Sequence, residues 1–167
     1  DSLSSRVTHA FDKKLIDIAV IRFPRISNFT DFSPFERYDN VSVRYVRRLS
    51  ELSNPDMIII PGTKSTIADL KWLRESGLET AVKKAASRGT LVFGICGGFQ
   101  MLGNLISDPL MVETSEMTKI SGLGLLDVET VLTKEKVQRQ IKGRFSGISG
   151  MLSVLNGMDY EGYEIHM

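Results

Sequence analysis

Short apolar runs recur along the first half of the chain and have the length of strands. Residues 16–21 and 91–95 are largely apolar, and residues 41–46 alternate apolar and polar side chains, as a half-buried strand does. Residues 57–60 contain no polar side chain and are followed by Pro61-Gly62. That pattern is typical of an interior parallel strand that opens into a functional loop.

Two amphipathic stretches follow the run at residues 57–60. Residues 67–77 repeat apolar side chains at helical spacing and end at Gly77, and residues 78–88 form a second predicted helix that ends at Gly89. Strands that alternate with helices of this length pack as right-handed parallel crossovers. The pattern therefore predicts an α/β fold with a doubly wound, mostly parallel sheet flanked by helices.

The last third of the chain has a different pattern. Residues 99–105 can continue as a helix after the run at 91–95, with Phe99, Leu102 and Ile106 on one side. A polar stretch then extends to Ser121 and is expected to be an exposed loop. A strand-rich C-terminal section follows, with predicted strands within residues 122–132, at 137–145 and at 163–166.

Composition narrows the class of protein. The chain has 167 residues, 42% hydrophobic and 25% charged, which is enough for one folded domain with a core. Its 21 basic and 20 acidic side chains nearly cancel, so neither nucleic acid nor a membrane surface is an expected partner. One cysteine excludes an internal disulfide, and no signal or membrane-spanning pattern is evident, so a cytoplasmic location is predicted. With Cys96 and only His9 and His166, no metal site is expected.

Cys96 is the residue whose surroundings favour chemistry. It lies between a predicted strand and a predicted helix, with Gly94, Gly97 and Gly98 around it. A turn this tight needs neighbours without a Cβ atom, which is the geometry of a nucleophile elbow. Amides at the start of the helix, Gly97 first, favour the thiolate and can hold a developing oxyanion. A lone cysteine is more often a buried core residue, but a core residue would not require glycines on both sides.

A cysteine nucleophile needs a proton acceptor. His9 lies in a polar stretch with nothing nearby to orient it, so His166 is the candidate base, with a structural role as the alternative. Glu164 lies on the same face of the last predicted strand. It is a candidate to orient His166, although it could instead hydrogen-bond a loop.

The segment from Gly94 to Gly103, with Cys96 and Gln100 inside it, resembles the nucleophile motif of the class I (triad-type) glutamine amidotransferases. Three further stretches, at residues 18–32, 61–74 and 162–167, are similar to the glutaminase domains of the cobyric acid synthase family. The resemblance covers nearly the whole chain. It implies a flavodoxin-like α/β fold that releases ammonia from glutamine through a thioester on the cysteine.

The resemblance also implies roles for individual residues. A loop that begins at Gly62 would donate an amide to the oxyanion opposite that of Gly97. Gln100 would contact the bound glutamine, and His166 would protonate the leaving ammonia. Thr63 stands where most of the class has a second glycine, as is normal for this subgroup. Most of the class also carries a glutamate two residues after the histidine. This chain does not include that position, and the resembled subgroup is not expected to have glutamate there.

Residues 1–14 are polar and non-periodic and are expected to be a linker or tail, with residues 15–167 as the glutaminase domain. In the resembled synthases an ATP-binding domain precedes the glutaminase. ATP, Mg²⁺ and the corrinoid substrate are therefore expected to bind outside this chain, and its ammonia would serve ATP-dependent amidation of adenosylcobyrinic acid a,c-diamide in cobalamin biosynthesis. The chain ends where the resembled domain continues, so we expect a C-terminally truncated fragment, and its activity in isolation is left open.

Two alternatives are retained. The chain could serve another ligase, such as cobyrinic acid a,c-diamide synthase or the peptidoglycan amidating enzyme, although residues 22–31 favour cobyric acid synthase. It could be a non-catalytic docking module that has kept the elbow, which an unreactive Cys96 would indicate.

Residues 62–66 resemble part of a phosphate loop but lack its first glycine, so the sequence does not favour a nucleotide site there. A plain turn there would be capped by Ser65 or Thr66.

Overall fold

A computed structural model describes residues 15–135 and 137–166. The chain divides into two units, with the boundary between Val131 and Leu132. The first unit contains strands β1 to β7 and all three α-helices, and the second contains β8, β9 and one short 3-10 helix. The linker or tail predicted at residues 1–14 lies outside the described residues.

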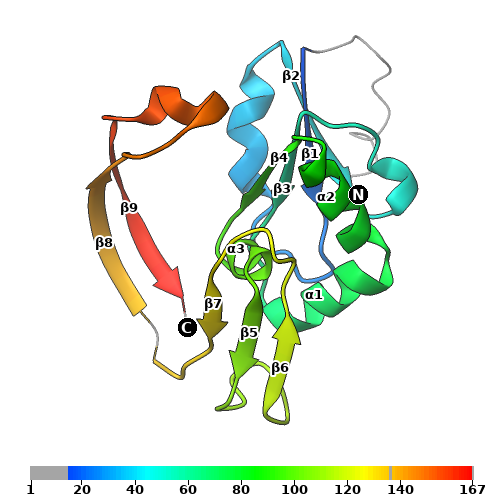
Figure 1. Cartoon of the computed structure of the whole chain (residues 1–167), viewed down its shortest axis with the longest axis vertical. Helices are drawn as coiled ribbons and strands as arrows, with labels where there is room; N and C mark the ends of the chain where they lie inside the picture. Colours follow the sequence, from blue (N-terminus) through cyan, green and yellow to red (C-terminus); the bar gives the residue numbers. More distant parts are fainter. Residues whose placement is uncertain (1–14, 136, 167) are drawn as a thin grey trace. The chain divides into compact units, whose positions relative to one another are not determined.

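A four-stranded parallel sheet forms the centre of the first unit, with strand order β2-β1-β3-β4 (Figure 1). The β3 and β4 strands are in register, so Ile60 pairs with Gly94 and both strands end at the same edge of the sheet. That shared edge places the loops after the two strands side by side. The strands are β1 (Ile16–Ile21), β2 (Val41–Val46), β3 (Met57–Ile60) and β4 (Leu91–Gly94), as the hydrophobic pattern predicts.

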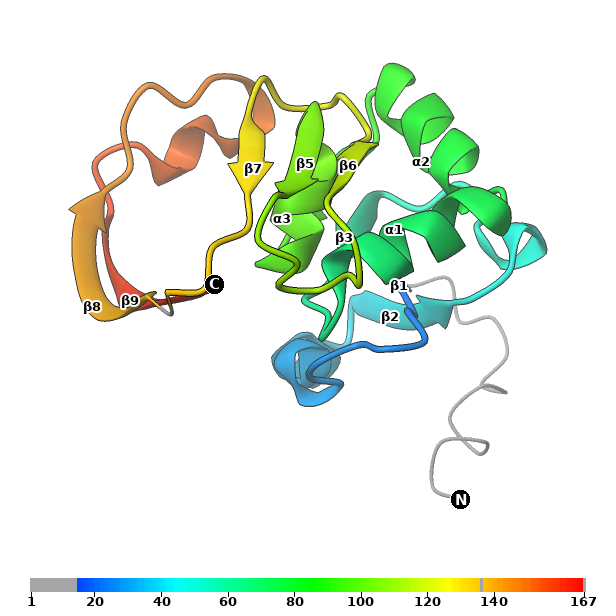
Figure 2. The same ribbon diagram turned by 90° about the horizontal axis from the view of Figure 1, so that it is seen from below.

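Helices α1 (Thr66–Glu75) and α2 (Leu78–Ser87) follow β3 and lie on one face of this sheet (Figure 2). Gly77 joins them with a φ of 77°, a left-handed conformation that suits a residue without Cβ. The predicted helix ends at Gly77 and Gly89 are thus confirmed. Together with the parallel sheet, the helices confirm the predicted α/β fold.

Strand alternation divides the core between the two faces of the sheet. On one face, Phe32 from the 3-10 helix η2 (Thr30–Arg37) packs with Ile18, Val20 and Ile59. The opposite face carries the buried side chains of Ala19, Ile21, Ile58 and Ile60, and α1 and α2 contribute Ile67, Leu70, Leu73, Leu78 and Val82 to the core. A second 3-10 turn, η3 (Leu49–Glu51), follows β2.

The predicted helix over residues 99–105 is wrong in its second half. Helix α3 (Gly97–Leu102) ends at Gly103, and β5 (Leu105–Asp108) begins directly after it. The backbone N–H of Asn104 donates to the oxygen of Val128 at 2.8 Å in place of a helical bond, and a Cβ on Gly103 would lie only 2.5 Å from that oxygen, so glycine permits this approach. Ile106 is therefore buried in a strand, and Phe99, expected on the same apolar helix side, is 47% exposed.

Strand β5 is the middle strand of a second sheet in the first unit, with order β6-β5-β7. It pairs antiparallel with β6 (Thr118–Ser121) and parallel with β7 (Glu129–Val131). The loop predicted up to Ser121 is therefore wrong over its last residues. The alternation of apolar and polar residues does not predict β6, because that strand is only four residues long and mostly polar.

The second unit is built on an antiparallel ribbon of β8 (Val137–Arg144) and β9 (Asp159–His166). The two strands confirm the predictions at residues 137–145 and 163–166. Three cross-strand ion pairs accompany the ladder: Arg139 with Glu164, Lys142 with Glu161, and Arg144 with Asp159. The 3-10 helix η4 (Gly150–Leu155) lies between the strands in the sequence.

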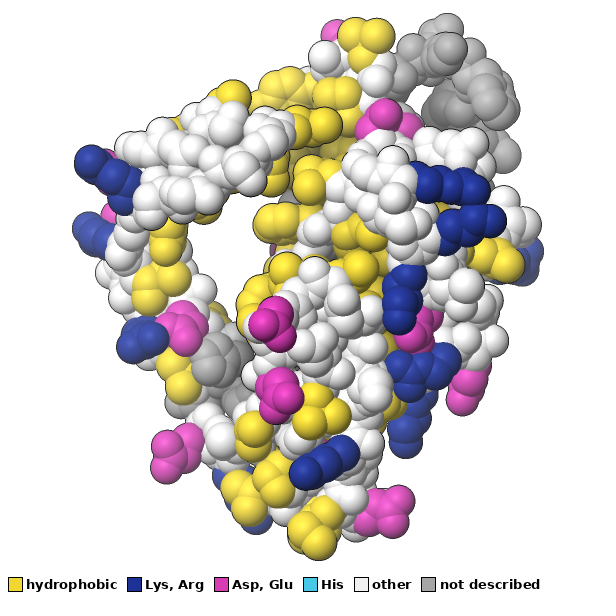
Figure 3. Space-filling view, in the orientation of Figure 1, with side chains coloured by type: hydrophobic (Ala, Val, Ile, Leu, Met, Phe, Trp, Pro, Cys, Tyr) yellow, Lys and Arg dark blue, Asp and Glu magenta, His cyan; other side chains and the backbone are white. Residues whose placement is uncertain are grey.

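Exposed Lys and Arg side chains gather on the side of α1 and α2 (Figure 3). They include Lys71, Arg74, Lys83 and Lys84. Arg74 is held by an ion pair to Glu79 with a separation of 2.6 Å, so part of this charge is already balanced. Of the helices that the structure describes, none has the length and apolar character needed to cross a bilayer.

Candidate active site

Cys96 lies at the turn between β4 and α3 and is exposed. Its φ is 50° and its ψ is −113°, which is a sparsely populated backbone conformation for a residue with a Cβ atom. The order of strand, strained turn and helix is the geometry expected of a nucleophile elbow. It presents the thiol at the edge where β3 and β4 end.

Two glycines of the elbow are required by close packing. A Cβ on Gly98 would lie 1.9 Å from the backbone oxygen of Ile60, and one on Gly94 would lie 2.6 Å from Cα of Phe99. Side chains at these two positions would collide with backbone atoms. The glycines around Cys96 therefore allow α3 to start directly against the ends of β3 and β4.

The loop after β3 lies beside the elbow. A Cβ on Gly62 would be 3.7 Å from Cβ of Cys96, and a Cβ on Gly97 would be 3.6 Å from the backbone nitrogen of Thr63. The backbone N–H of Ile95 also donates to the oxygen of Ile60, at 3.0 Å, and so continues the pairing of β3 with β4. The structure thus brings Gly62, Cys96 and Gly97 together, and their roles in an oxyanion site stay predictions.

The segment after β1 anchors this loop. The N–H of Ser27 donates to the backbone oxygen of Gly62 at 3.0 Å, and the N–H of Lys64 donates to that of Arg25 at 3.0 Å. Ile26 and Thr63 form an isolated antiparallel bridge between these bonds. The motif after β1 and the loop after β3 are therefore joined by backbone pairing.

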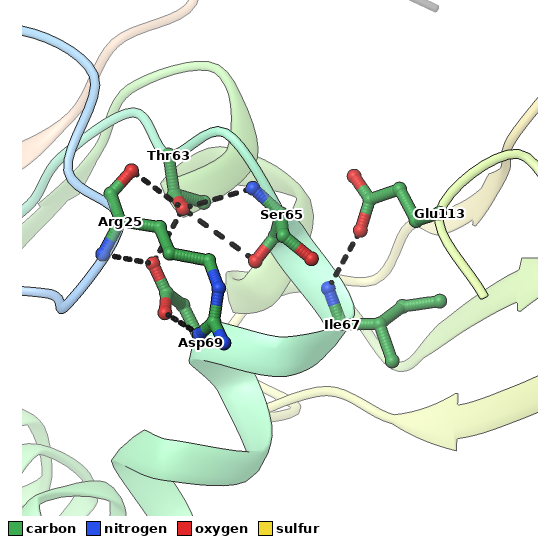
Figure 4. Close-up of polar contacts among 6 residues, drawn as sticks. All are labelled: Arg25, Thr63, Ser65, Ile67, Asp69 and Glu113. Carbon is green, nitrogen blue, oxygen red and sulfur yellow. Dashed lines mark hydrogen bonds and ion pairs between the residues drawn. The ribbon is translucent and has the colours of Figure 1, made fainter.

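The side chains of the same two segments meet at Asp69 of α1 (Figure 4). The Thr63 hydroxyl donates to Oδ2 of Asp69 at 2.5 Å. The Arg25 N–H donates to the same oxygen at 3.2 Å, and the Arg25 guanidinium donates to Oδ1 at 3.0 Å. Asp69 is fully buried, so these donors compensate the loss of its hydration.

The N-terminus of α1 is capped by a residue that sequence reasoning missed. The N–H of Ile67 donates to Oε2 of Glu113 at 2.9 Å (Figure 4). The expected cap by Ser65 or Thr66 is wrong, because Ser65 forms no side-chain cap bond and the Thr66 hydroxyl donates to Oε1 of Gln100 at 3.3 Å. Glu113 lies 46 positions after Ile67, beyond the reach of any local capping motif.

Asp108 holds the loop that carries Glu113. Its buried carboxylate accepts the N–H groups of Val112, Glu113 and Thr114 and the Thr114 hydroxyl, at 2.7 to 3.0 Å. Burial by itself would raise the pKa of Asp108, but these hydrogen bonds outweigh it and lower the pKa below its ordinary value. The Asp-Pro sequence indicated a break here but not the anchor, because Asp108 accepts from residues four to six positions later, beyond the two-residue reach of an Asx turn.

Gln100, the predicted glutamine contact, is half-buried on α3 one turn after Cys96. Its side-chain oxygen faces the hydroxyl of Thr66 at the start of α1. A Cβ on Gly97 would lie 3.1 Å from the same hydroxyl oxygen. Gln100 is thus placed near Gly97, on the side of the elbow formed by the start of α1.

The predicted base and its partner lie in the second unit. His166 is the last residue of β9 and pairs with Val137 of β8. The Glu164 carboxylate accepts a 2.5 Å bond from Nε of Arg139 and is 27% exposed. The roles of His166 and Glu164 stay predictions. Within residues 15–135 and 137–166, no group of three or more His, Cys, Asp or Glu side chains is placed to hold a metal ion.

Comparison with known families settles the class of this domain. The family model of the CobB/CobQ-like glutamine amidotransferase domain matches residues 17–167. The chain belongs to this family. The matched range includes both the anchoring segment after β1 and β9, which ends with His166.

Curated relatives of this chain with about half or more of their aligned residues identical include cobyric acid synthases. That of Lachnoclostridium phytofermentans is 59% identical over 167 residues, which is 100% of this chain and 32% of the relative. That of Ruminiclostridium cellulolyticum is 53% identical, with the same coverage of 100% and 32%. That of Moorella thermoacetica is 52% identical over 91% of this chain and 29% of its own length. The chain thus spans about a third of the length of the relatives it matches.

Solved structures support the fold. A crystal structure of a glutamine amidotransferase matches with a TM-score of 0.60 and 21% identity, over 89% of this chain and 70% of that one. The PurLQS structure from Thermotoga maritima matches with a TM-score of 0.59 and 17% identity, over 90% of this chain and 66% of that one. At these identities the likeness concerns the arrangement of helices and strands.

Proposed function

We propose that the amidotransferase domain hydrolyses glutamine at Cys96 and delivers the ammonia to an ATP-dependent synthetase reaction. The observation that carries this proposal is the exposed Cys96 in a strained elbow, with the loop at Gly62 beside it. A positive φ on a cysteine costs free energy and does not improve packing. Such strain is characteristic of a residue retained for its chemistry.

In the proposed reaction the Cys96 thiolate attacks the side-chain amide carbon of glutamine. The amides of Gly97 and of the loop at Gly62 hold the tetrahedral oxyanion. When the intermediate collapses, the C–N bond breaks, His166 donates a proton to the leaving nitrogen, and ammonia departs. Water then attacks the thioester, with His166 now accepting a proton, and releases glutamate and the thiol.

Two further residues have supporting roles in this proposal. Gln100 contacts the bound glutamine, and its place beside Gly97 supports that role. Glu164 orients His166, and the ion pair with Arg139 would hold that carboxylate in place. The same ion pair is also compatible with a purely structural role for Glu164 in the β8–β9 ribbon.

The cobyric acid synthase relatives suggest the use of the ammonia. We propose that it amidates peripheral carboxylates of adenosylcobyrinic acid a,c-diamide in cobalamin biosynthesis, in the cytoplasm. ATP, Mg²⁺ and the corrinoid would bind to parts of the synthase that correspond to the two thirds of the relatives not matched here. Identity of 50% or more with three such relatives supports this assignment over other ligases.

The test is ammonia release from glutamine by this chain and by any longer protein that contains it, with and without ATP and corrinoid. We expect glutamate and ammonia in equal amounts, and loss of both in Cys96→Ser. A longer protein that amidates cobyrinic acid but not its a,c-diamide would indicate the neighbouring ligase. No ammonia from any form would indicate a docking module instead.

A further inference from the structure

The segment Arg22-Phe23-Pro24-Arg25-Ile26-Ser27 supplies no residue to the reaction described above, yet it is tied closely to the loop after β3. We propose that Arg25, Thr63 and Asp69 form a clamp that positions the oxyanion loop at Gly62-Thr63 against Cys96. None of the three side chains acts on the substrate directly. This inference rests on the proposed glutaminase function and specifies how its oxyanion site is kept in place.

Asp69 is the fixed point of the clamp. It belongs to the first turn of α1, has no exposed surface, and sits among buried apolar neighbours such as Ile67 and Leu70. A carboxylate at such a position is unfavourable unless donors surround it. Here three donors do so, and all come from the segments at Arg25 and Thr63 (Figure 4).

Thr63 couples the clamp to the elbow. Its hydroxyl has three acceptors within reach: Asp69 at 2.5 Å, the Arg25 oxygen at 3.2 Å and the Ser65 oxygen at 3.5 Å. The carboxylate is both nearest and charged, so it takes the proton. The same hydroxyl oxygen accepts the N–H of Ser65 at 3.2 Å. Both the donor and the acceptor capacity of the Thr63 hydroxyl are thereby used.

The other groups of Thr63 lie against the elbow. Its Cγ2 would be 2.9 Å from a Cβ on Gly97, and its backbone nitrogen would be 3.6 Å from the same position. The hydrogen bond from the Thr63 hydroxyl to Asp69 ties Thr63 to α1. Loss of this bond would allow Thr63, and the loop amide with it, to shift relative to Gly97.

Fixed amide donors matter most when charge develops in the transition state. Loss of the clamp would leave Cys96, Gly97 and Gln100 unchanged but would allow the Gly62-Thr63 loop to shift. Glutamine would still bind, while the oxyanion would be held less well. We therefore expect a fall in kcat with little change in KM.

The test compares Thr63→Val, Thr63→Ser and Asp69→Asn by glutaminase kinetics. Valine keeps the branched shape and removes only the hydroxyl, so we expect kcat to fall about 10-fold with KM within about 2-fold. Serine restores the hydroxyl and should return kcat to within about 2-fold of wild type. Asp69→Asn, which weakens the charged bonds, should lower kcat at least as much as Thr63→Val.

The matched control is Asp17→Asn. It breaks the ion pair of Asp17 with Arg44 near the start of β1, at the opposite end of that strand from the clamp, and should leave kcat unchanged. An active wild type together with a Thr63→Val variant of unchanged kcat would overturn the clamp alone. A wild type that neither releases ammonia nor forms an adduct at Cys96 would overturn the proposed function, and the clamp with it.

Discussion

Cys96 retains a φ of 50° although it has a Cβ atom. A backbone conformation of this kind costs on the order of 1–3 kcal/mol and persists only where surrounding packing imposes it. Gly94 and Gly98, pressed against Phe99 and Ile60, supply that packing. At the scale of the residue, the elbow therefore holds stored strain at the position of the proposed nucleophile.

The strain makes a stability prediction for Cys96→Gly. Glycine adopts positive φ without a Cβ penalty, so the free energy of unfolding should rise by about 1 kcal/mol, after allowance for the greater backbone entropy of the unfolded chain. Urea denaturation measures this. The Cys96→Ser variant keeps a Cβ and should not be stabilised. Equal unfolding midpoints for the glycine and serine variants would contradict stored strain at Cys96.

Gly62 provides a way to change the site without changing the fold. A Cβ there would have its nearest neighbours, Cβ of Cys96 and the oxygen of Ile95, at 3.7 Å, which is ordinary van der Waals contact. Gly62→Ala should therefore fold with an unchanged melting temperature, while its methyl group occupies space beside the thiol. We expect glutaminase activity to fall by roughly 10-fold or more.

Gly162→Ala is the matched control for this change, because a Cβ at Gly162 of β9 has no neighbour within 4 Å. It should leave both the melting temperature and the activity unchanged. Full activity in Gly62→Ala would mean that the loop at Gly62 does not border the reacting atoms, and the oxyanion assignment would have to move elsewhere.

The residue pattern alone singled out Cys96 and Gly97 as candidates, because a tight turn has a strong residue requirement, and the family resemblance added Gly62. Neither located Asp69, Asp108 or Glu113. Asp69 and Glu113 have distant partners, 44 and 46 positions away, and the partners of Asp108 are backbone N–H groups of an irregular loop four to six positions later. The residues that neighbour an acidic side chain in the sequence do not show such pairings, so sequence analysis expects the acidic side chain to be exposed.

At the scale of elements, the loop after β5 depends on Asp108. Because the pKa of this carboxyl is lowered in the folded chain, its ionised form favours folding. That contribution is present above the unfolded pKa, near 3.8, and is lost as the pH falls through the lower folded pKa. The loop that carries Glu113 to the start of α1 should weaken over the same pH range.

Asp108→Asn tests this dependence. At neutral pH the variant should be less stable than wild type by roughly 2–4 kcal/mol, because an amide replaces an anion that accepts four hydrogen bonds. The difference should shrink as the pH falls below about 4, because the unfolded wild-type chain then takes up a proton at Asp108 before the folded chain does. The measurement is the free energy of unfolding of both proteins between about pH 3 and 7 at matched salt concentration. A difference that stays constant over this range would contradict the account.

Elements were predictable where the apolar pattern was long and uninterrupted. The strands β1 to β4 and helices α1 and α2 lie within two residues of their expected bounds because burial on one or both faces dictates their side chains. Helix α3 and strand β5 were not separated, since Leu105 and Ile106 suit either conformation. The close approach of Gly103 to Val128, a tertiary contact, decides the outcome.

At the scale of the whole molecule, the family match extends over both units, from residue 17 to residue 167. The proposed nucleophile, Cys96, lies in the first unit and the proposed base, His166, in the second. The residue pattern and the family resemblance predict both roles. The action of Cys96 as a glutaminase nucleophile, with His166 as its base, is the central claim, and it requires a direct chemical test.

The most direct test is covalent labelling of Cys96 by a diazo ketone analogue of glutamine, read by mass spectrometry. We expect one adduct at Cys96 that glutamine prevents, no adduct in Cys96→Ser, and slower labelling in His166→Ala. The chain and any longer protein that contains it are compared, and labelling of the longer protein alone would show that further residues complete the site. Absence of a glutamine-protected adduct in both would contradict the assignment of Cys96 as a glutaminase nucleophile.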